Sequence, residues 1–323
     1  MDLQTVRDAA LQKLPSTLYP STMALGDFVL IAVQIGPSHR FGARFKILLI
    51  KRKHMEQDYE SSANEFLELA SEQRLAILLR LNKQKSKVSI LAKELDATVP
   101  EVFRNFERLV KADLITKDSD GSYSITAYGK IVCGQVPSLQ FLSSNRKYFK
   151  NHDFGDIPQK FLQRIGALLE GKQIKGFVKI MEHWKEIHKN ASEYICNILF
   201  EIPYTADLVE PLVKTIGNGT KLRSILSEVA IVPSERKQVF EKLGFKKLIE
   251  RGLVERKMKE NVLVVVILNE KEACIMFPKT NGEVDMSEGF YGNTPSFQEW
   301  CLDYFEHCWK HSGLFQESKL KRE

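Results

Sequence analysis

The chain has 323 residues, of which 43% are hydrophobic and 27% are charged, and its formal net charge is +6. This composition excludes a disordered or fibrous protein, and the length is enough for two or three domains. Residues 1–54 hold eight Lys or Arg against three Asp, so they carry +5 of this charge and leave +1 for the rest. A nucleic-acid site after residue 54 must therefore be a local basic patch.

The cysteines and the apolar runs indicate in which cellular compartment the protein is expected. Five cysteines are scattered through the chain without a CxxC pair. An odd number at such spacing does not form a disulfide framework, which indicates a reducing cytoplasm. No apolar run approaches the about 20 residues of a membrane span, so no membrane partner is expected.

Residues 1–54 differ from the remainder in composition. They contain Pro, Ser and Thr clusters, two short apolar runs and the basic stretch KRK at 51–53. The charges follow the apolar runs, unlike those of a signal peptide, and a capping-box spacing at Ser62 and Glu65 indicates a domain start after Met55. Two interpretations stay open. Residues 1–54 are an extension that is disordered or precedes the functional start, or they are a strand-bearing extension.

Residues 55–140 predict three helices and a hairpin. Apolar spacing predicts helices over 71–83 and 87–98, and Thr98, Pro100 and Glu101 predict the capped start of a third. At about 100° per residue, one side of this third helix is apolar. It consists of Val102, Phe103, Phe106, Leu109 and Val110. The opposite side consists of Glu101, Arg104, Arg108 and Lys111, with Asn105 and Glu107 on the flanks. LITK and SYSIT, joined by DSDG, predict a hairpin, and a further amphipathic segment follows it.

This order is that of a winged helix-turn-helix, in which the third helix enters the major groove and the hairpin lies along phosphates. Arginine suits guanine and asparagine suits adenine in direct base readout. The candidate DNA-binding residues are Lys85, Lys87, Thr98, Glu101, Arg104, Asn105, Arg108, Lys111, Lys117, Ser122 and Tyr123. The alternative is that the arginines belong to an ordinary solvated helix face.

The stretch EVFRNFERLVKADLI…DGSYSITAYG resembles the ArsR-like winged-helix regulators of archaea, in particular the methanogenesis-regulatory (Fil-type) family. The similarity continues through YFKNHDFGDIP, GTKLRSIL, NEKEACIMFPKTNGEVD and FQEWCLDYFEHCW, and it covers residues 60 to 312. The resemblance implies DNA binding by the first domain and effector sensing by the second. Asp113 stands where winged helices usually have Gly, and Asp tolerates the left-handed conformation there.

Residues 141–312 predict an α/β domain, followed by a charged tail at 313–323. Helices are expected over 157–170, 173–189 and 234–252. A strand at 193–203, a crossover helix and the strand TKLRSILSE imply parallel pairing. Ligands of such sheets lie beyond the carboxyl ends of the strands. Those ends fall near Phe200, Glu201, Leu226, Ser227 and Glu228. Glu201 and Arg223 are the ligand-binding candidates, with a carboxylate as the ligand of Arg223. The alternative for Arg223 is an edge or solvent-facing position.

Two further chemistries have partial motifs in the sequence. His183, Lys185 and Asn190 superficially match the HxKxxxxD pattern of phospholipase D-like enzymes, but the match ends in Asn, lies on a helical stretch and has no second copy. One segment contains four potential metal ligands, namely Cys301, His307, Cys308 and His311. The sequence has no distant ligand pair that would complete a metal site. No catalytic residue, metal or cofactor is therefore predicted. The aromatic face of this last helix fits a dimer interface instead.

The sequence predicts a cytoplasmic, homodimeric transcription regulator. Its partners would be double-stranded DNA and a small-molecule effector, with two recognition helices meeting half-sites about one DNA turn apart. The alternatives are a winged-helix protein-interaction module that does not bind DNA and, less favoured, a phospholipase D-like enzyme.

Overall fold

The computed structural model describes residues 22–25, 28–35, 44–51, 53–201, 206–233 and 236–322. The chain divides into two compact units, Met1–Lys130 and Ile131–Glu323. Helix α6 (Ala127–Ser144) begins in the first unit and ends in the second.

The first described elements form a three-stranded antiparallel sheet. Its strands are β1 (Thr22–Leu25), β2 (Phe28–Ile35) and β3 (Arg44–Lys51). The side chains of residues 1–54 lie outside the described part of the structure, so the prediction that this segment lacks a core is not tested. Residues 1–21 lie outside the described residues altogether.

Helix α2 (Lys53–Leu69) corrects the predicted capping box at Ser62 and Glu65. Ser62 and Glu65 lie inside this helix and form no capping box, because the Glu, Gln and Ala residues around them continue the helix. The next helix is instead capped at Ser71, whose Oγ accepts a hydrogen bond from the Arg74 backbone N–H at 3.4 Å.

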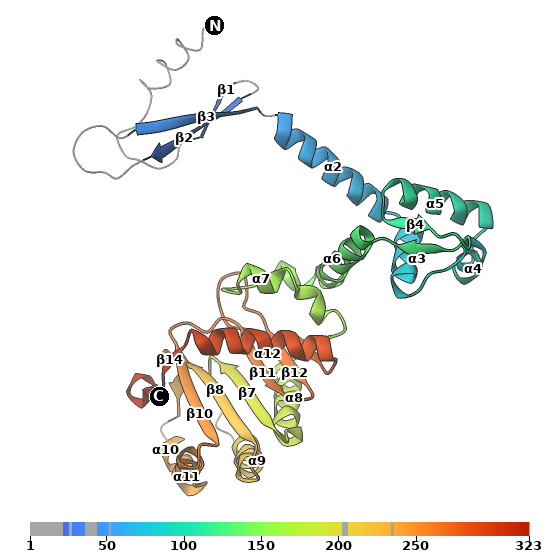
Figure 1. Cartoon of the computed structure of the whole chain (residues 1–323). Helices are drawn as coiled ribbons and strands as arrows, with labels where there is room; N and C mark the ends of the chain where they lie inside the picture. The colour runs from blue at the N-terminus through green and yellow to red at the C-terminus, as the bar shows by residue number, and fades with distance from the viewer. Residues whose placement is uncertain are drawn as a thin grey trace. The chain divides into compact units, whose positions relative to one another are not determined.

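Three short helices and a hairpin follow (Figure 1). They are α3 (Glu72–Lys83), α4 (Val88–Glu94), α5 (Val99–Lys111), β4 (Ile115–Lys117) and β5 (Tyr123–Ile125). β4 and β5 pair antiparallel. Ser86, between α3 and α4, forms an isolated antiparallel bridge with Tyr123 beside this hairpin. This is the predicted element order of a winged helix, with β4 and β5 as the wing.

The core of the winged helix forms around α5. Val102, Phe106 and Leu109 are buried, and the Phe106 ring meets the Tyr123 ring edge-on at 4.6 Å. A Cβ at Gly129 would overlap the Leu114 carbonyl oxygen, so glycine lets the start of α6 approach the chain between α5 and β4. Fully burying such apolar side chains contributes about 1.5–3 kcal/mol each to stability.

The turn after α5 has the predicted left-handed residue. Asp113 has a φ of 56°. The Leu114 N–H donates to the Leu109 carbonyl at 3.0 Å, which is the six-to-one bond of a Schellman motif and satisfies one of the last carbonyls of α5. The motif places Leu114 in the core and starts the wing.

The second unit contains an eight-stranded mixed sheet. In spatial order the strands are β14 (Gly313–Leu314), β10 (Val254–Lys259), β8 (Lys221–Ser227), β7 (Tyr194–Leu199), β11 (Val265–Asn269), β12 (Ala273–Met276), β13 (Glu288–Gly292) and β6 (Lys172–Lys175). β10, β8 and β7 are parallel, which confirms the predicted β7–β8 pairing, and the other pairs are antiparallel.

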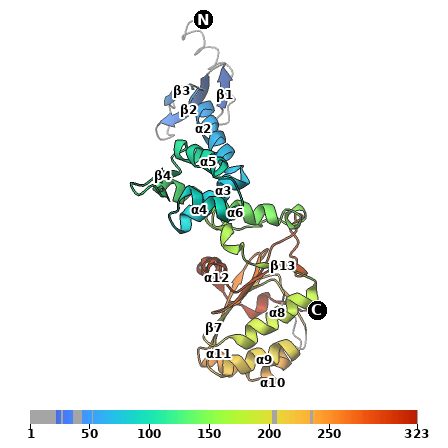
Figure 2. The same cartoon turned by 90° about the vertical axis from the view of Figure 1, so that its right-hand side faces the viewer.

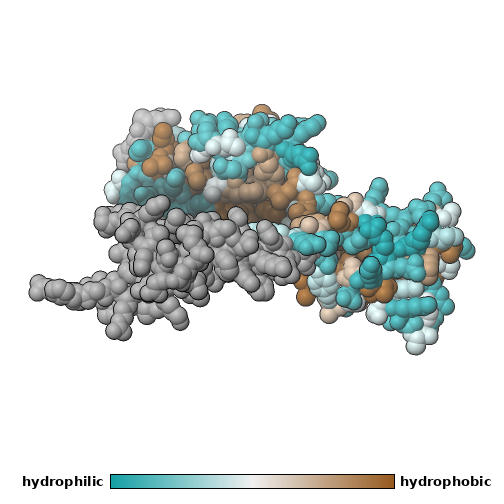
Figure 3. All heavy atoms as spheres, turned by 90° about the horizontal axis from the view of Figure 1, so that it is seen from above, coloured by the Kyte–Doolittle hydropathy of each residue, from teal (hydrophilic) through white to brown (hydrophobic). Residues whose placement is uncertain are grey.

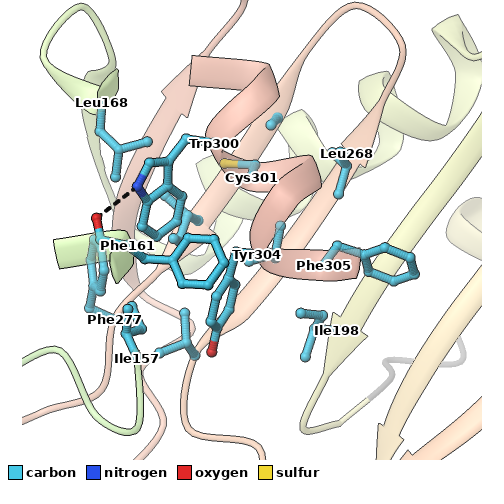
Figure 4. Close-up of a cluster of buried hydrophobic side chains, with 14 of the residues drawn as sticks. Ile157, Phe161, Leu168, Ile198, Leu268, Phe277, Trp300, Cys301, Tyr304 and Phe305 are labelled. Carbon is cyan, nitrogen blue, oxygen red and sulfur yellow. Dashed lines mark hydrogen bonds between the residues drawn. The ribbon is translucent and has the colours of Figure 1, made fainter. Parts of the chain in front are cut away.

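Helices cover both faces of this sheet (Figures 1 and 2). α12 (Pro295–Lys310) lies on one face, and α8 (Phe177–Asn190) and α9 (Ala206–Gly217) lie on the other. Ile198 packs in the cluster with α12, whereas Leu199 packs in the cluster with α8, as strand alternation requires. In Figure 4 the Trp300 indole N–H donates to the Phe161 carbonyl at 3.1 Å.

Two predicted helices are each divided into two shorter elements. The predicted helix 157–170 consists of α7 (Gln159–Leu162) and the 3-10 turn η2 (Ile165–Leu168). The predicted helix 234–252 consists of α10 (Arg236–Lys242) and α11 (Phe245–Glu250), separated at Gly244, whose φ of +68° no regular helix allows.

The helix predicted over 173–189 also begins late. Residues 172–175 form strand β6 on β13, and α8 starts only after Gly176, whose φ is +105°. At the other end, the charged segment after residue 312 supplies β14, the turn η3 (Glu317–Lys319) and β15 (Lys321–Arg322), which pairs with β9 (Ile231–Val232).

Candidate nucleic-acid interface

The outer side of α5 carries two cations seven residues apart. Arg104 and Lys111 are both exposed, and a separation of seven residues places them almost in line on a helix. Within the described part of the chain, neither side chain forms an ion pair. Both remain available to an external anion or base edge.

Arg108 is held differently, although it lies one turn from Arg104. Its Nη2 lies 2.6 Å from Glu68 Oε1 at the end of α2. The hydrogen bond and charge of Glu68 raise the pKa of the Arg108 guanidinium. Glu68 also pairs with the buried Arg74 at 3.0 Å, so Arg108 belongs to a network between helices.

Glu101 and Asn105, also on α5, form hydrogen bonds within the domain. The Gln73 amide N–H donates to Glu101 Oε1 at 3.1 Å, and the Asn105 amide N–H donates to Gln73 Oε1. The predicted basic face is therefore split. Arg104 and Lys111 point away from the domain, whereas Glu101, Asn105 and Arg108 contact α2 and α3. Sequence analysis missed Glu68 and Gln73, because their contacts span 28 to 40 residues.

The predicted capping box of α5 is absent. Thr98 is the N-cap residue, but its side chain makes no capping hydrogen bond. The Glu101 carboxylate, which such a box directs back to the N-cap backbone, binds Gln73 instead. Thr98 is exposed beside the first turn of α5.

The apolar side of α5 is narrower than predicted. Phe103 and Val110 were expected in the core, yet they are 42% and 38% exposed, and Val99 is 51% exposed. The buried residues of α5 are Val102, Phe106 and Leu109, on the side that packs against the rest of the domain. Apolar residues do reach the surface of the molecule, as the brown areas among the teal ones in Figure 3 show.

Two predicted phosphate contacts on the wing are wrong. Ser122 and Tyr123 are 4% and 6% exposed. The Ser122 hydroxyl donates to Asp120, and the Tyr123 ring packs on Phe106. These contacts and the bridge between Tyr123 and Ser86 use both residues to stabilise the wing. Lys117 is exposed, with its ammonium 5.9 Å from the Tyr123 ring centroid.

The tip of the wing is acidic. Hydrogen bonds from Ser122, together with one from Lys85, hold the pKa of Asp120 well below its usual range. Lys85 Nζ lies 3.0 Å from Asp120 Oδ2, so its charge is locally compensated. Lys87, at the N-cap of α4, is exposed and forms no ion pair within the described residues.

The ligand candidates of the second unit do not form one site. Arg223 lies on β8, between β7 and β10, so it is not on an edge strand. Its Nη2 lies 3.1 Å from Glu306 Oε2, and its guanidinium lies 4.4 Å from the Trp309 ring centroid. The predicted carboxylate partner is thus a residue of α12. Glu201 is exposed immediately after β7.

The histidines that the sequence singled out lie on helices α8 and α12. His183 lies on α8 and stacks on Tyr291 at 4.3 Å, and the Asn190 amide donates to Glu272 at 2.9 Å. The ring centroids of His307 and His311 lie 4.4 Å apart on α12. Among the described residues, no group of three or more His, Cys, Asp or Glu is placed to hold a metal ion.

No protein-family model matches the chain, and no curated protein matches it. Solved structures do match in part. TrmBL2, an archaeal chromatin protein with a novel mode of DNA binding, is 11% identical over 76% of this chain and 94% of its own, with a TM-score of 0.36. Reduced HlyU from Vibrio cholerae is 20% identical over 27% of this chain and 96% of its own, with a TM-score of 0.25. Nuc, a phospholipase D family member from Salmonella typhimurium, is 15% identical over 46% of this chain and 100% of its own, with a TM-score of 0.29.

All three TM-scores lie below 0.5, so the class of the protein rests on its own elements. Residues 72–130 have the element order of a winged helix, three helices and a hairpin, and the second unit is a mixed sheet between helices. Across the described part of the chain, no helix combines the length and apolar character needed to cross a bilayer.

Proposed function

We propose that this chain is a DNA-binding transcription regulator that reads duplex DNA with helix α5. The proposal is carried by the exposed line of Arg104 and Lys111 on the third helix of a winged helix. Arg104 would hold guanine O6 and N7 with two hydrogen bonds. Lys111, near the end of the helix, would contact a phosphate.

Two lysines supply the remaining phosphate contacts in this proposal. Lys87 stands at the start of α4, and Lys117 lies on the wing strand β4. Both are exposed. They would fix the register of the protein on the duplex without reading bases. Lys85, being paired with Asp120, would contribute less.

We also propose a homodimer in which the second unit senses a small molecule or joins the subunits. Tyr59 and Phe66, seven residues apart on α2, are 70% and 61% exposed and would suit a helix–helix contact between copies. All five cysteines are buried, and their odd number without a CxxC pair supports a reducing cytoplasm. Catalysis is not proposed, because His183 stacks on Tyr291 and has no second histidine motif.

A protein-interaction winged helix is the second candidate. It is favoured by Val99, Phe103 and Val110, three exposed apolar side chains along α5, and by the acidic tip of the wing. A partner protein would cover the apolar side chains, whereas the carboxylates would oppose phosphates.

The test measures binding of the full chain to a duplex from its own promoter over a salt series. Wild type is compared with Arg104→Ala, and Arg108→Ala serves as the matched control on the same helix. We expect affinity to fall steeply with salt and Arg104→Ala to lose about tenfold in specific affinity, while Arg108→Ala changes little. A folded wild-type protein without salt-dependent binding would favour the protein-interaction function instead.

A further inference from the structure

A row of polar side chains crosses the sheet face that α8 and α9 cover. Asn197 on β7 is the register partner of Ser224 on β8, and Ser224 is the partner of Arg256 on β10. All three line one cavity, so they point to the same face. Their neighbours on that face, Leu199 and Leu226, are apolar and buried. A polar row at the centre of an apolar face requires hydrogen-bond partners.

His188 on α8 lies over this row and is neutral. Its Nε2 accepts a hydrogen bond from the Trp184 indole N–H at 3.0 Å. An indole only donates, so Nε2 carries no proton and the proton of the neutral ring lies on Nδ1. Burial lowers the pKa of His188 to about 3. The Nδ1–H, in a side chain that is 1% exposed, has no partner among the described residues.

Asn197 supplies the complementary unpaired group. The side chain is 2% exposed, and its Nδ2 lies 3.4 Å from His188 Nε2. Its Oδ1 has no hydrogen-bond partner in the part of the chain that the structure describes. One buried donor and one buried acceptor thus belong to two side chains that line the same cavity.

The cavity has a volume of about 50 Å³. Apolar and aromatic side chains complete its wall, namely Trp184, Leu208, Val209, Leu212, Leu222, Phe240 and Phe245. An apolar cavity of about 150 Å³ holds benzene. This smaller space therefore suits a molecule, or the end of one, with only a few non-hydrogen atoms.

The charges around the cavity are already compensated. Arg236 and Arg256 line it, but both pair with Glu317 in the turn η3, and Arg256 also lies 3.8 Å from the Phe315 ring centroid. A ligand carboxylate would have to compete with Glu317 for these guanidinium groups. The unmet hydrogen bonds of His188 and Asn197 select a neutral polar group instead.

We propose that this cavity is the effector site of the second unit, and that it takes a small neutral molecule with a hydroxyl or primary amide. The ligand accepts a hydrogen bond from His188 Nδ1–H and donates one to Asn197 Oδ1, while its apolar part contacts the leucines and aromatic rings. The site deepens the sensing role proposed above. It is tested by binding without DNA, so failure here leaves the DNA-binding proposal untouched.

The experiment titrates the full chain with acetamide and with 2-propanol by ligand-observed NMR. Acetate serves as the isosteric charged control for acetamide. We expect saturable binding of both neutral probes, and at least tenfold weaker binding of acetate. Asn197→Leu, which removes the acceptor at similar volume, should weaken the neutral probes at least tenfold. Asn218→Leu, exposed beyond α9, should leave their binding unchanged. If Asn197→Leu does not fold, Ser224→Val, which adds volume to the cavity wall, provides the same comparison.

Three results would overturn the proposal. Absence of saturable binding of either neutral probe to wild type would mean that the cavity holds only water. Equal binding by wild type and a folded cavity variant would place the probes elsewhere. Acetate binding as tightly as acetamide would show that the arginines, and not the neutral pair, select the ligand.

Discussion

Arg104 of the first unit and two arginines of the second unit are placed differently. On the outer side of the winged helix, Arg104 is exposed and forms no ion pair within the described residues. In the second unit, Arg223 and Arg256 each lie against an aromatic ring and pair with a carboxylate of the same chain. An arginine whose charge and planar face are both satisfied stabilises its own domain, whereas an unpaired one is available to a partner.

The largest expected effect concerns Arg223, an arginine that pairs with a carboxylate and an aromatic ring of its own chain. Arg223→Ala removes the contact with Trp309 and leaves Glu306 without its cation. Since Arg223 is largely covered, the free energy of unfolding should fall by about 2 kcal/mol. Urea unfolding monitored by tryptophan fluorescence measures this change.

Arg164→Ala is the matched control for this change. Arg164 forms an ion pair with Asp303 at 2.8 Å, but it is 49% exposed. Removing such a surface pair should change stability by less than about 1 kcal/mol. Equal losses in the two variants would contradict the distinction drawn between covered and exposed arginines.

The second prediction separates stability from binding at Arg104. Arg104→Ala should leave the free energy of unfolding unchanged within about 0.5 kcal/mol while its specific DNA affinity falls by about 1.4 kcal/mol. Arg108→Ala should leave DNA affinity unchanged, because its partner is Glu68, and as an exposed ion pair it should lower stability only slightly. Chemical unfolding and duplex binding of the same two proteins test the pair. A loss of stability in Arg104→Ala would mean that this side chain serves the fold.

The third prediction extends the comparison to a carboxylate of the second unit. Partial burial raises the pKa of Glu270, but hydrogen bonds from the Ser192 hydroxyl and backbone N–H outweigh it and lower this pKa to about 2. A depressed folded-state pKa stabilises the fold above the unfolded pKa of about 4.3. This contribution is lost as the pH falls through 2.

The Glu270 carboxylate should therefore lower the free energy of unfolding by about 1 kcal/mol when the pH falls from 5 to 2. Glu270→Gln should remove that part of the pH dependence. Denaturant unfolding of both proteins at several pH values measures the difference. Parallel pH profiles would show that the Ser192 hydrogen bonds do not favour the ionised form.

Local patterns predicted much of the winged helix. Apolar spacing located α3 and α5, Asp-Gly located the wing turn, and Asp113 has the predicted left-handed backbone. These features depend on neighbours within a few residues, which a single sequence displays. The two predicted capping boxes do not form. The Glu101 carboxylate accepts a hydrogen bond from Gln73 instead, and Ser62 lies within a longer helix.

Features that depend on distant contacts were not predicted. The pairing of Arg108 with Glu68, and the row of Asn197, Ser224 and Arg256, follow from helix packing and strand register. A signal for the cavity was nevertheless present. Asn197 interrupts the apolar strand YICNIL, and His188 falls on the apolar stripe of α8. Such isolated polar residues mark positions where the fold must supply a partner.

The smallest expected effect tests the wing. Asp120→Asn keeps a side chain that accepts from Ser122, but it removes the charge that holds Lys85. The freed ammonium and the lost carboxylate both favour a phosphate nearby, so DNA affinity should rise about threefold. The slope of log affinity against log salt should steepen by up to about 0.9, the value for one added phosphate contact.

The double variant Asp120→Asn/Lys85→Ala separates the two contributions. If Lys85 gains a phosphate contact, the double variant should lose the added salt slope and keep only the gain from the missing carboxylate. An unchanged affinity and slope in Asp120→Asn would mean that the wing tip lies away from the duplex. In that case the phosphate contacts of the winged helix would be confined to the exposed lysines Lys87, Lys111 and Lys117, and the acidic tip would face solvent or a protein partner.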